Sequence, residues 1–317
     1  MNNIILIADK YSEENHIDIT NTFLECANEE YFHDIYTVLS EIDPNLIHYS
    51  SPVEFLNNIT KHKNDIVISI WSGSSNLNRK IIVPSICEAY GIRYLGADPY
   101  VQFTCQDKAL SKYIAKQYGI SSANGVLVKN ESELYKIGKL NFPVIVKPNY
   151  EGGSIGISDK NICFTEAEAQ KLTKKLFSLF HEAILIEEYL TGHEVCVTIA
   201  GNNRHIDVLQ ADEIIVDYDR YPVFGFESKK AHSVKISRRP ATNLINPVDR
   251  DCFVKLFTDL GKVDVMRIDG KIEEGEFKLI ELSPDTHLGK SASTAYAFGL
   301  AGYTYRQMFE LLISYIR

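Results

Sequence analysis

Several features that mark particular classes of protein are absent from this sequence or scarce in it. No run of about 18 apolar residues occurs, so no transmembrane helix is expected. Residues 1–9 form a short apolar stretch with no basic segment before it, which favours a first β-strand over a signal peptide. The six cysteines are scattered and include no Cys-x-x-Cys pair, as is typical of buried free thiols in a reducing cytosol. We therefore expect a cytoplasmic protein.

Positive charge is also in short supply. The chain has 33 lysines and arginines against 42 aspartates and glutamates, a formal net charge of −9. This acidic balance argues against nucleic acid or an anionic membrane as the main partner, but it leaves room for a local basic pocket that binds phosphates. Apolar residues make up 45% and charged residues 24% of the 317, which fits a globular protein of about two domains.

Strand and helix signals alternate in the first third of the chain. The expected elements are a strand at 3–8, a helix at 14–31, a strand at 65–71, a helix at 79–90 and a short strand at 93–95. Alternation of this kind implies parallel strands covered by helices. We therefore expect an N-terminal α/β domain over residues 1–105.

The rest of the chain is richer in strands. The expected elements are a helix at 107–118, strands at 124–128 and 142–147, a helix at 165–181, strands at 184–189, 194–200 and 204–210, an irregular stretch at 211–240, a helix at 247–260, a hairpin at 263–282 and two final helical stretches. This pattern predicts an α+β body with mostly antiparallel strands. We divide it into a central unit over 106–183 and a C-terminal unit over 184–317.

One candidate site is a glycine-rich loop that follows a strand ending in a lysine. Lys147 precedes the run Glu-Gly-Gly-Ser-Ile-Gly at 151–156. Glycines let backbone N–H groups approach an anion, and a lysine beside them adds a point charge for phosphate. The loop is neither a P-loop nor a Gly-x-Gly-x-x-Gly motif. The alternative is an ordinary hairpin with a flexible turn. Lys108, in the first turn of a helix, is a second cation that is either solvated or directed at phosphate.

A second candidate is the hairpin near residue 275. If its turn centres on Gly275, Asp269 faces Glu281 and Arg267 faces Ser283, all on one face of the sheet. Like charges directly opposite each other destabilise a sheet, so two facing carboxylates favour a cation between them. Mg²⁺ accepts one or two carboxylates together with substrate phosphates. The alternative is a solvent-facing edge with both acids hydrated.

A third candidate is the segment from 184 to 195, in which an apolar strand delivers Glu187, passes Leu190 and a tight connection, and then delivers Glu194. Carboxylates accept hydrogen bonds from ribose hydroxyls, and a backbone segment can read an adenine edge. The alternative is a strand–turn–strand unit with surface acids.

The order of these pieces resembles the ATP-grasp superfamily, and most closely its D-alanine–D-alanine ligase group. The motifs are Asp-Lys-x-x-Ser-Lys from Asp107, Pro-Val-Ile-Val-Lys-Pro with the glycine-rich loop, Glu-Glu-Tyr-Leu-x-Gly-x-Glu from Glu187, Arg-x-Asp from Arg267 and Glu-x-Ser from Glu281. The resemblance covers residues 107–310 well and residues 1–106 loosely. It implies an ATP-grasp fold of three domains with ATP between the central and C-terminal ones. It also implies an ATP-dependent carboxylate–amine ligase that forms an amide through an acyl phosphate and uses Mg²⁺ or Mn²⁺.

The resemblance also assigns roles to individual residues. By this resemblance, the ATP phosphates are contacted by Lys108, Lys147, Gly153 and Ser154, adenine is read by Glu187 and the backbone near Leu190, and the ribose is held by Glu194. The metal is bound by Asp269, Glu281 and Ser283. Arg267 stabilises the acyl phosphate and the tetrahedral intermediate, and Lys229, in a mobile loop over 211–235, contacts phosphate. These assignments make Arg267, Lys229 and Ser154 the catalytic set.

The departures from the family pattern cluster on the amino-acid side. Ser283 stands where the family usually has asparagine, and Asp285 or water is an alternative ligand there. Lys230 replaces a tyrosine or histidine, and Glu14 matches an acid that holds an amino group. Either Ser291 or Ser293 is the serine that helps to bind substrate.

These departures leave three functional hypotheses open. The first is a ligase that joins small amino acids other than two D-alanines, the second is a true D-alanine–D-alanine ligase of cell-wall synthesis, and the third is a nucleotide-binding protein that has lost catalysis. The partners expected are small-molecule amino acids, with no nucleic acid and no membrane. The oligomeric state stays open, a homodimer being one candidate.

Overall fold

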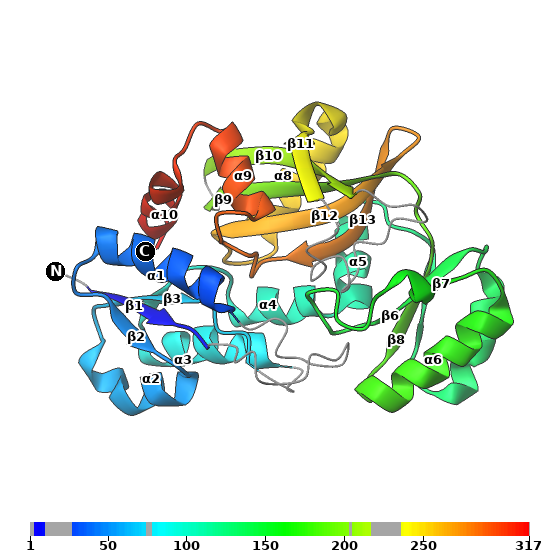
Figure 1. Ribbon diagram of the computed structural model, residues 1–317, viewed down its shortest axis with the longest axis horizontal. Coiled ribbons are helices and arrows are strands. Elements are labelled where there is room, and N and C mark those ends of the chain that lie inside the picture. Colours follow the sequence, from blue (N-terminus) through cyan, green and yellow to red (C-terminus); the bar gives the residue numbers. More distant parts are fainter. Residues whose placement is uncertain (1–2, 10–26, 74–77, 203–204, 217–235, 317) are drawn as a thin grey trace.

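The computed structural model describes residues 3–9, 27–73, 78–202, 205–216 and 236–316, and three β-sheets organise them (Figure 1). Most of the helix expected at 14–31 lies outside the described residues. The first described helix, α1 (Glu29–Ile42), starts near the end of that range and continues beyond it. The Asn28 side chain caps α1 by accepting a hydrogen bond from the Tyr31 backbone N–H, which fixes where the helix begins.

The first sheet is parallel, as the alternation of strands and helices predicted. Its strands are β1 (Ile4–Ile7), β2 (Ile47–Tyr49), β3 (Ile66–Ser69) and β4 (Arg93–Tyr94), in the order β2-β1-β3-β4. The helices between them include α2 (Pro52–Asn58) and α3 (Ile82–Tyr90), with short 3-10 turns at Ile59–Lys61 and Arg79–Ile81. All four residues of β1 are buried, as expected for a strand covered on both faces.

The second sheet is small and antiparallel. Its strands are β5 (Gly125–Val128), β6 (Val144–Pro148), β7 (Ile162–Cys163) and β8 (Ile184–Glu188), in the order β5-β8-β6-β7, accompanied by α6 (Glu166–Phe180) and by 3-10 turns at Glu131–Lys139 and Asp159–Asn161. The expected unit boundary between residues 183 and 184 is therefore wrong. Strand β8 pairs with both β5 and β6, so the boundary falls after Glu188.

The third sheet is the largest and is antiparallel throughout. Its strands are β9 (His193–Asn202), β10 (His205–Val216), β11 (Ile236–Pro240), β12 (Val265–Glu273) and β13 (Glu276–Ser283), in the order β11-β10-β9-β12-β13. The expectation of irregular structure over 211–240 is wrong at both ends. Residues 211–216 continue β10, and Asp212 to Val216 pair with Pro240 to Ile236 of β11. The longest strands of the chain thus lie side by side in one surface.

One face of the large sheet is an apolar core. Val195, Val197 and Ile199 alternate along β9, and they pack against helix α8 (Pro247–Asp259) through the buried Phe253 and Phe257. Each such phenylalanine contributes roughly 2–3 kcal/mol of hydrophobic burial. Two further helices share this core, α4 (Pro99–Gln106) and α5 (Lys108–Gln117). The stretch that forms α5 thus packs with the C-terminal sheet, and assigning it to the central unit was wrong.

The C-terminal helices close the fold onto the first sheet. A 3-10 turn at Thr242–Leu244 connects β11 to α8, and the chain reaches these helices after β13. Helix α9 (Ser293–Leu300) lies against β10, and α10 (Tyr305–Ser314) packs against α1, as seen at the left of Figure 1. Met308, Phe309 and Leu312 share a core with Ile35 and Leu39. Within the described part of the chain, no helix combines the length and the apolar character needed to cross a membrane.

Candidate active site

A cavity of about 640 Å³ lies where residues of the three sheets meet. Its volume is in the range of small-molecule sites in enzymes. The residues predicted from the sequence that line it are Lys108, Lys147, Gly153, Ser154, Glu194, Arg267, Asp269, Glu281, Ser283, Ser291 and Ser293. Glu187 and Leu190 do not line it. Glu14, Lys229 and Lys230 lie outside the described residues, as does most of the expected loop over 211–235.

The polar face of the large sheet forms one wall of this cavity. Asp269 pairs in register with Glu281 on one side and with Cys196 on the other, and Cys196 in turn pairs with Asp212. The next row places Arg267 opposite Ser283. The predicted pairing of these four hairpin residues is therefore confirmed. Since side chains alternate between the faces of a strand, the apolar positions face the core and these polar ones face the cavity.

The hairpin reaches this register by a route that the sequence did not reveal. Its turn is Glu274-Gly275, both with positive φ (51° and 83°), and Glu273 pairs with Glu276, so the turn centres half a residue before Gly275. An irregularity at Ile280 restores the register, because Gly270 pairs with Leu279 while Asp269 pairs with Glu281. Because of this extra residue, Glu281 lies on the cavity face of the strand, although Leu279, two residues before Glu281, lies in the apolar core.

Cations compensate both carboxylates of the pair. Arg267 donates from Nε to Asp269 Oδ1 at 2.6 Å and from Nη2 to Oδ2 at 2.7 Å. Burial lowers the pKa of Arg267, but Asp269 together with Cys196 and Glu281 raises it by more, so the net shift is upward and the guanidinium stays charged. Lys108 Nζ lies 3.7 Å from Glu281 Oε1 and also donates to the Glu151 carbonyl. Each carboxylate of the pair thus has a basic side chain beside it in the cavity wall.

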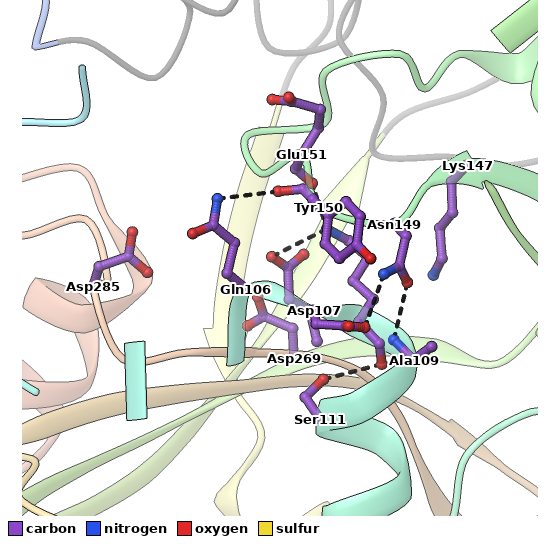
Figure 2. Close-up of polar contacts among 12 residues, drawn as sticks. Gln106, Asp107, Ala109, Ser111, Lys147, Asn149, Tyr150, Glu151, Asp269 and Asp285 are labelled. Atoms are coloured by element: carbon purple, nitrogen blue, oxygen red, sulfur yellow. Dashed lines mark hydrogen bonds and ion pairs between the residues drawn. The ribbon is translucent and has the colours of Figure 1, made fainter. Parts of the chain in front are cut away.

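This donor set fits a divalent cation such as Mg²⁺. Two facing carboxylates and the hydroxyl of Ser283, on the same face of β13, are hard oxygen ligands, and Mg²⁺ needs only one or two carboxylates when phosphates supply the rest. Across the described residues there is no group of three or more His, Cys, Asp or Glu side chains placed to hold a metal. The alternative ligand Asp285 lines the cavity but pairs with Lys80 at 2.5 Å, and Figure 2 shows it on a separate segment from Asp269.

Glu187 has a different environment from the one expected. Its carboxylate is 3% exposed and forms ion pairs with Lys147, at 2.5 Å, and with Lys112. In this structure its side chain is the counter-ion of two lysines, and the contact of Glu187 with adenine stays a prediction. Burial lowers the pKa of Lys112 to about 8 although Glu187 opposes the shift, while the two lysines lower the pKa of Glu187 against its own burial. The sequence did not predict the role of Lys112.

The backbone expected to read adenine also has a partner. The Leu190 carbonyl accepts a hydrogen bond from Lys271 Nζ at 2.9 Å, and the same ammonium lies 5.1 Å from the Tyr189 ring centroid. Tyr189, Lys271 and Glu194 line the cavity, and Lys271 pairs in register with Glu194. Lys271 was missed, although it lies two residues after Asp269 and the period of a strand would have placed it on the same face.

The glycine-rich loop holds a strained backbone beside the cavity. Gly153 and Ser154 both have positive φ (60° and 65°), a conformation that costs Ser154 of order 1 kcal/mol. A Cβ atom on Gly156 would lie 2.7 Å from the Pro148 side chain, so the loop packs closely over the end of β6. At its start, the Glu151 carboxylate accepts a hydrogen bond from Arg79 Nη2 at 3.2 Å, while Gln106 contacts the Tyr150 carbonyl (Figure 2).

Another part of the cavity wall consists largely of the segment from 285 to 293 and the start of α1, which the resemblance predicts as the amino-acid side. His287 stacks on Tyr31 with ring centroids 3.7 Å apart, and the Leu288 N–H donates to the Tyr31 hydroxyl. Ser291 is exposed to the cavity, whereas the buried Ser293 donates to Asp212 Oδ2 at 2.8 Å. Asp212, like Arg238 beside it, was not predicted from the sequence.

Comparison with known proteins agrees with this geometry. The family model described as D-ala D-ala ligase C-terminus matches residues 114–314. An uncharacterized protein, y4sG of Sinorhizobium fredii, is 26% identical over 252 residues, covering 77% of this chain and 72% of that protein. A D-alanine--D-alanine ligase of Thermotoga maritima is 22% identical over 261 residues, covering 82% of each.

Solved structures show the same fold. The VanG D-Ala:D-Ser ligase of Enterococcus faecalis superposes with a TM-score of 0.74 at 17% identity, covering 99% of this chain and 98% of that one. A D-alanine--D-alanine ligase of Bacillus anthracis complexed with ATP gives a TM-score of 0.70 at 18% identity, covering 99% and 97%. The chain therefore belongs to the D-alanine–D-alanine ligase family, as a divergent member with the ATP-grasp fold.

Proposed function

We propose that this protein is an ATP-dependent carboxylate–amine ligase that joins two small amino acids through an acyl phosphate. The observation that carries the proposal is the content of the cavity of about 640 Å³: the facing carboxylates of Asp269 and Glu281, with Arg267 and Lys108 beside them, line it together with further cations that include Lys147. Membership of the D-alanine–D-alanine ligase family supports the same reaction class.

The first step would transfer the γ-phosphoryl group of ATP to a substrate carboxylate and release ADP. Negative charge gathers on the transferring group, so the step needs fixed positive charge around it. Lys108 and Lys147, which line the cavity, would meet the phosphates, and backbone N–H groups near Gly153 and Ser154 would add neutral donors. When bound, a divalent ion held by Asp269, Glu281 and Ser283 would neutralise further phosphate charge.

The second step would form the amide. The amine of the second substrate attacks the acyl carbon, loses a proton, and expels inorganic phosphate. Arg267, fixed by its two hydrogen bonds to Asp269, would stabilise the oxyanion that forms at that carbon. Glu14, Lys229 and Lys230 keep in this proposal the roles that the resemblance assigns: amino-group binding for Glu14, phosphate contact for Lys229 and substrate contact for Lys230.

We propose amino acids other than two D-alanines as the substrates. Several positions where this chain departs from the family pattern line the cavity, among them Ser283 and the segment from Asp285, and we take that segment as the side that would bind the amino acids. The structural neighbour named as a D-Ala:D-Ser ligase illustrates that this fold also occurs in a ligase named for a different second amino acid.

A substrate panel tests the proposal. Protein, Mg-ATP and pairs of D- and L-amino acids are mixed, phosphate release is followed, and the product mass is measured. We expect release that depends on amino acids, with a product mass equal to the two substrates less one water. ATP binding without amino-acid-dependent release from any pair would instead favour a nucleotide-binding protein that has lost catalysis, an interpretation that Ser283 in the place of asparagine keeps open.

A further inference from the structure

Arg238, on the edge strand β11, has an arrangement that the proposed mechanism does not use. It lines the cavity with its side chain 24% exposed, and its neighbour Asp212 is fully buried on β10. Arg238 Nε lies 3.2 Å from Asp212 Oδ2 and 3.3 Å from the Ser293 hydroxyl, to which it donates. Ser293 in turn donates to the same Asp212 oxygen. The guanidinium is therefore held at its Nε edge.

The pairing of Arg238 differs from that of Arg267 in the same cavity. Arg267 engages both oxygens of Asp269 with two nitrogens, the arrangement expected of an ion pair that is complete in itself. Within the described residues, Arg238 donates one hydrogen bond, from Nε, and its two terminal nitrogens make none. Asp212 Oδ1 is also buried without a hydrogen-bond partner among those residues. An arginine held by one edge presents a planar pair of donors on its other side.

The position of Arg238 fits the amino-acid side of the site. Asp212 and Asp269 belong to one row of the sheet with Cys196 between them, so their backbones lie roughly 10 Å apart, two strand spacings. Arg238 reaches inward from the edge toward Asp212, and Arg267 contacts Asp269. A small amino acid whose reacting amine lies near Arg267 is short enough to lie between the two guanidinium groups. Its other charged group is the carboxylate, which would then lie toward Arg238.

We propose that the terminal nitrogens of Arg238 bind the free carboxylate of the amino-acid acceptor, with Asp212 and Ser293 as positioning residues. Planar two-point binding of a carboxylate is what the guanidinium geometry favours. The protein would then discriminate amino acids from amines or amides of the same shape. The inference rests on the proposed function in taking amino acids as ligands, but it concerns binding and does not require turnover.

The test compares acids with their amides. Wild-type protein with a non-hydrolysable ATP analogue is titrated calorimetrically with D- and L-alanine, serine and glutamate, and with the α-amide of each. We expect at least one amino acid to bind about 10-fold or more tightly than its amide. Arg238→Gln should remove this preference, and Arg238→Lys, which keeps the charge without the planar fork, should retain part of it. Affinity for the ATP analogue should not change in either variant.

Arg239→Gln is the matched control. Arg239 is the next residue, 57% exposed, and pairs with Glu213 at 2.6 Å rather than with Asp212. It should bind like the wild type, and thermal melts show whether the Arg238 variants remain folded. Unchanged preference for acids in folded Arg238→Gln would overturn the inference, as would the absence of binding by every amino acid in the panel. Binding with the expected preference but without phosphate release would sustain it and remove the proposed ligase activity.

Discussion

The two halves of the cavity are built differently. On the half where we propose that the nucleotide binds, called the nucleotide half, Lys108, Lys147 and Lys271 come from a helix start and two strands, and each has a fixed partner in the protein. On the half where we propose that the amino acids bind, called the amino-acid half, much of the wall is the connection between β13 and α9. Charge compensation for phosphates needs side chains that are held in fixed positions. The sequence of a connecting segment, by contrast, can change without disturbing a sheet. We therefore expect substitutions to be tolerated more readily in the connecting segment than at the paired lysines.

The largest effect that would test this contrast is expected at the carboxylate pair. Glu281→Gln keeps the shape and removes one charge, so amino-acid-dependent phosphate release should fall at least ~100-fold. Stability should change by less than about 1 kcal/mol, because the Glu281 side chain is 29% exposed and its cation is 3.7 Å away. Asp269→Asn should also stop turnover, but it removes the two-point partner of Arg267 and should destabilise by about 2–3 kcal/mol.

Glu276→Gln serves as the control for this pair, since Glu276 lies on the same strand, at the turn, with a side chain that is 70% exposed. It should be indistinguishable from the wild type in phosphate release. A Glu281→Gln variant that works at near-normal rate would contradict the metal role.

A smaller effect is expected at the buried lysine behind the nucleotide half. The pKa of Lys112 is lowered from 10.5 to about 8, so below pH 8 the charged lysine lowers the stability of the folded protein relative to a neutral one. Between pH 8 and 10.5 the unfolded chain binds the extra proton, and stability should therefore rise with pH. Lys112→Met removes the titrating group, so this rise of stability between pH 8 and 10.5 should be absent; because the buried Glu187 then has Lys147 as its one remaining cation, the variant should be less stable than the wild type at pH 7.

The same variant should bind ATP roughly 10-fold less tightly, because it removes one positive charge from the group that includes Lys147 and faces the phosphates. Chemical denaturation across pH and ATP titration measure the two effects. Lys116→Met, on the exposed side of the same helix, controls for loss of a lysine without burial. A Lys112→Met variant whose stability still rises between pH 8 and 10.5 would show that Lys112 is not the group that titrates in this range.

The sequence predicted the parts of the molecule that depend on local pattern. Strand period placed Asp269 opposite Glu281, and the glycine-rich loop was found from its composition. The sequence could not predict that Ile280 would be an extra residue on its strand of the hairpin, because a bulge depends on how the two strands twist in the sheet. Nor could it assign Glu187, whose two lysine partners lie 75 and 40 positions away along the chain. Long-range ion pairs have no local signature.

The smallest effects concern the two serines of the amino-acid half, between which the sequence could not choose. Ser293 is 2% exposed and its hydroxyl bridges Asp212 and Arg238, so Ser293→Ala should destabilise by about 1–2 kcal/mol. Ser291 is exposed to the cavity and makes no hydrogen bond within the described residues. Ser291→Ala should leave the melting temperature unchanged and raise KM for the acceptor amino acid roughly 3- to 10-fold, with KM for ATP unaltered.

Steady-state kinetics on both variants, together with melts, separates a contact with substrate from a contact within the protein. If Ser293→Ala raised KM for the acceptor without loss of stability while Ser291→Ala did nothing, the hydroxyl of Ser293 would have to turn from Asp212 to the substrate. The amino-acid half would then rearrange when substrate binds, whereas the ion pairs of the nucleotide half stay fixed. The two halves would therefore differ in mobility as well as in sequence.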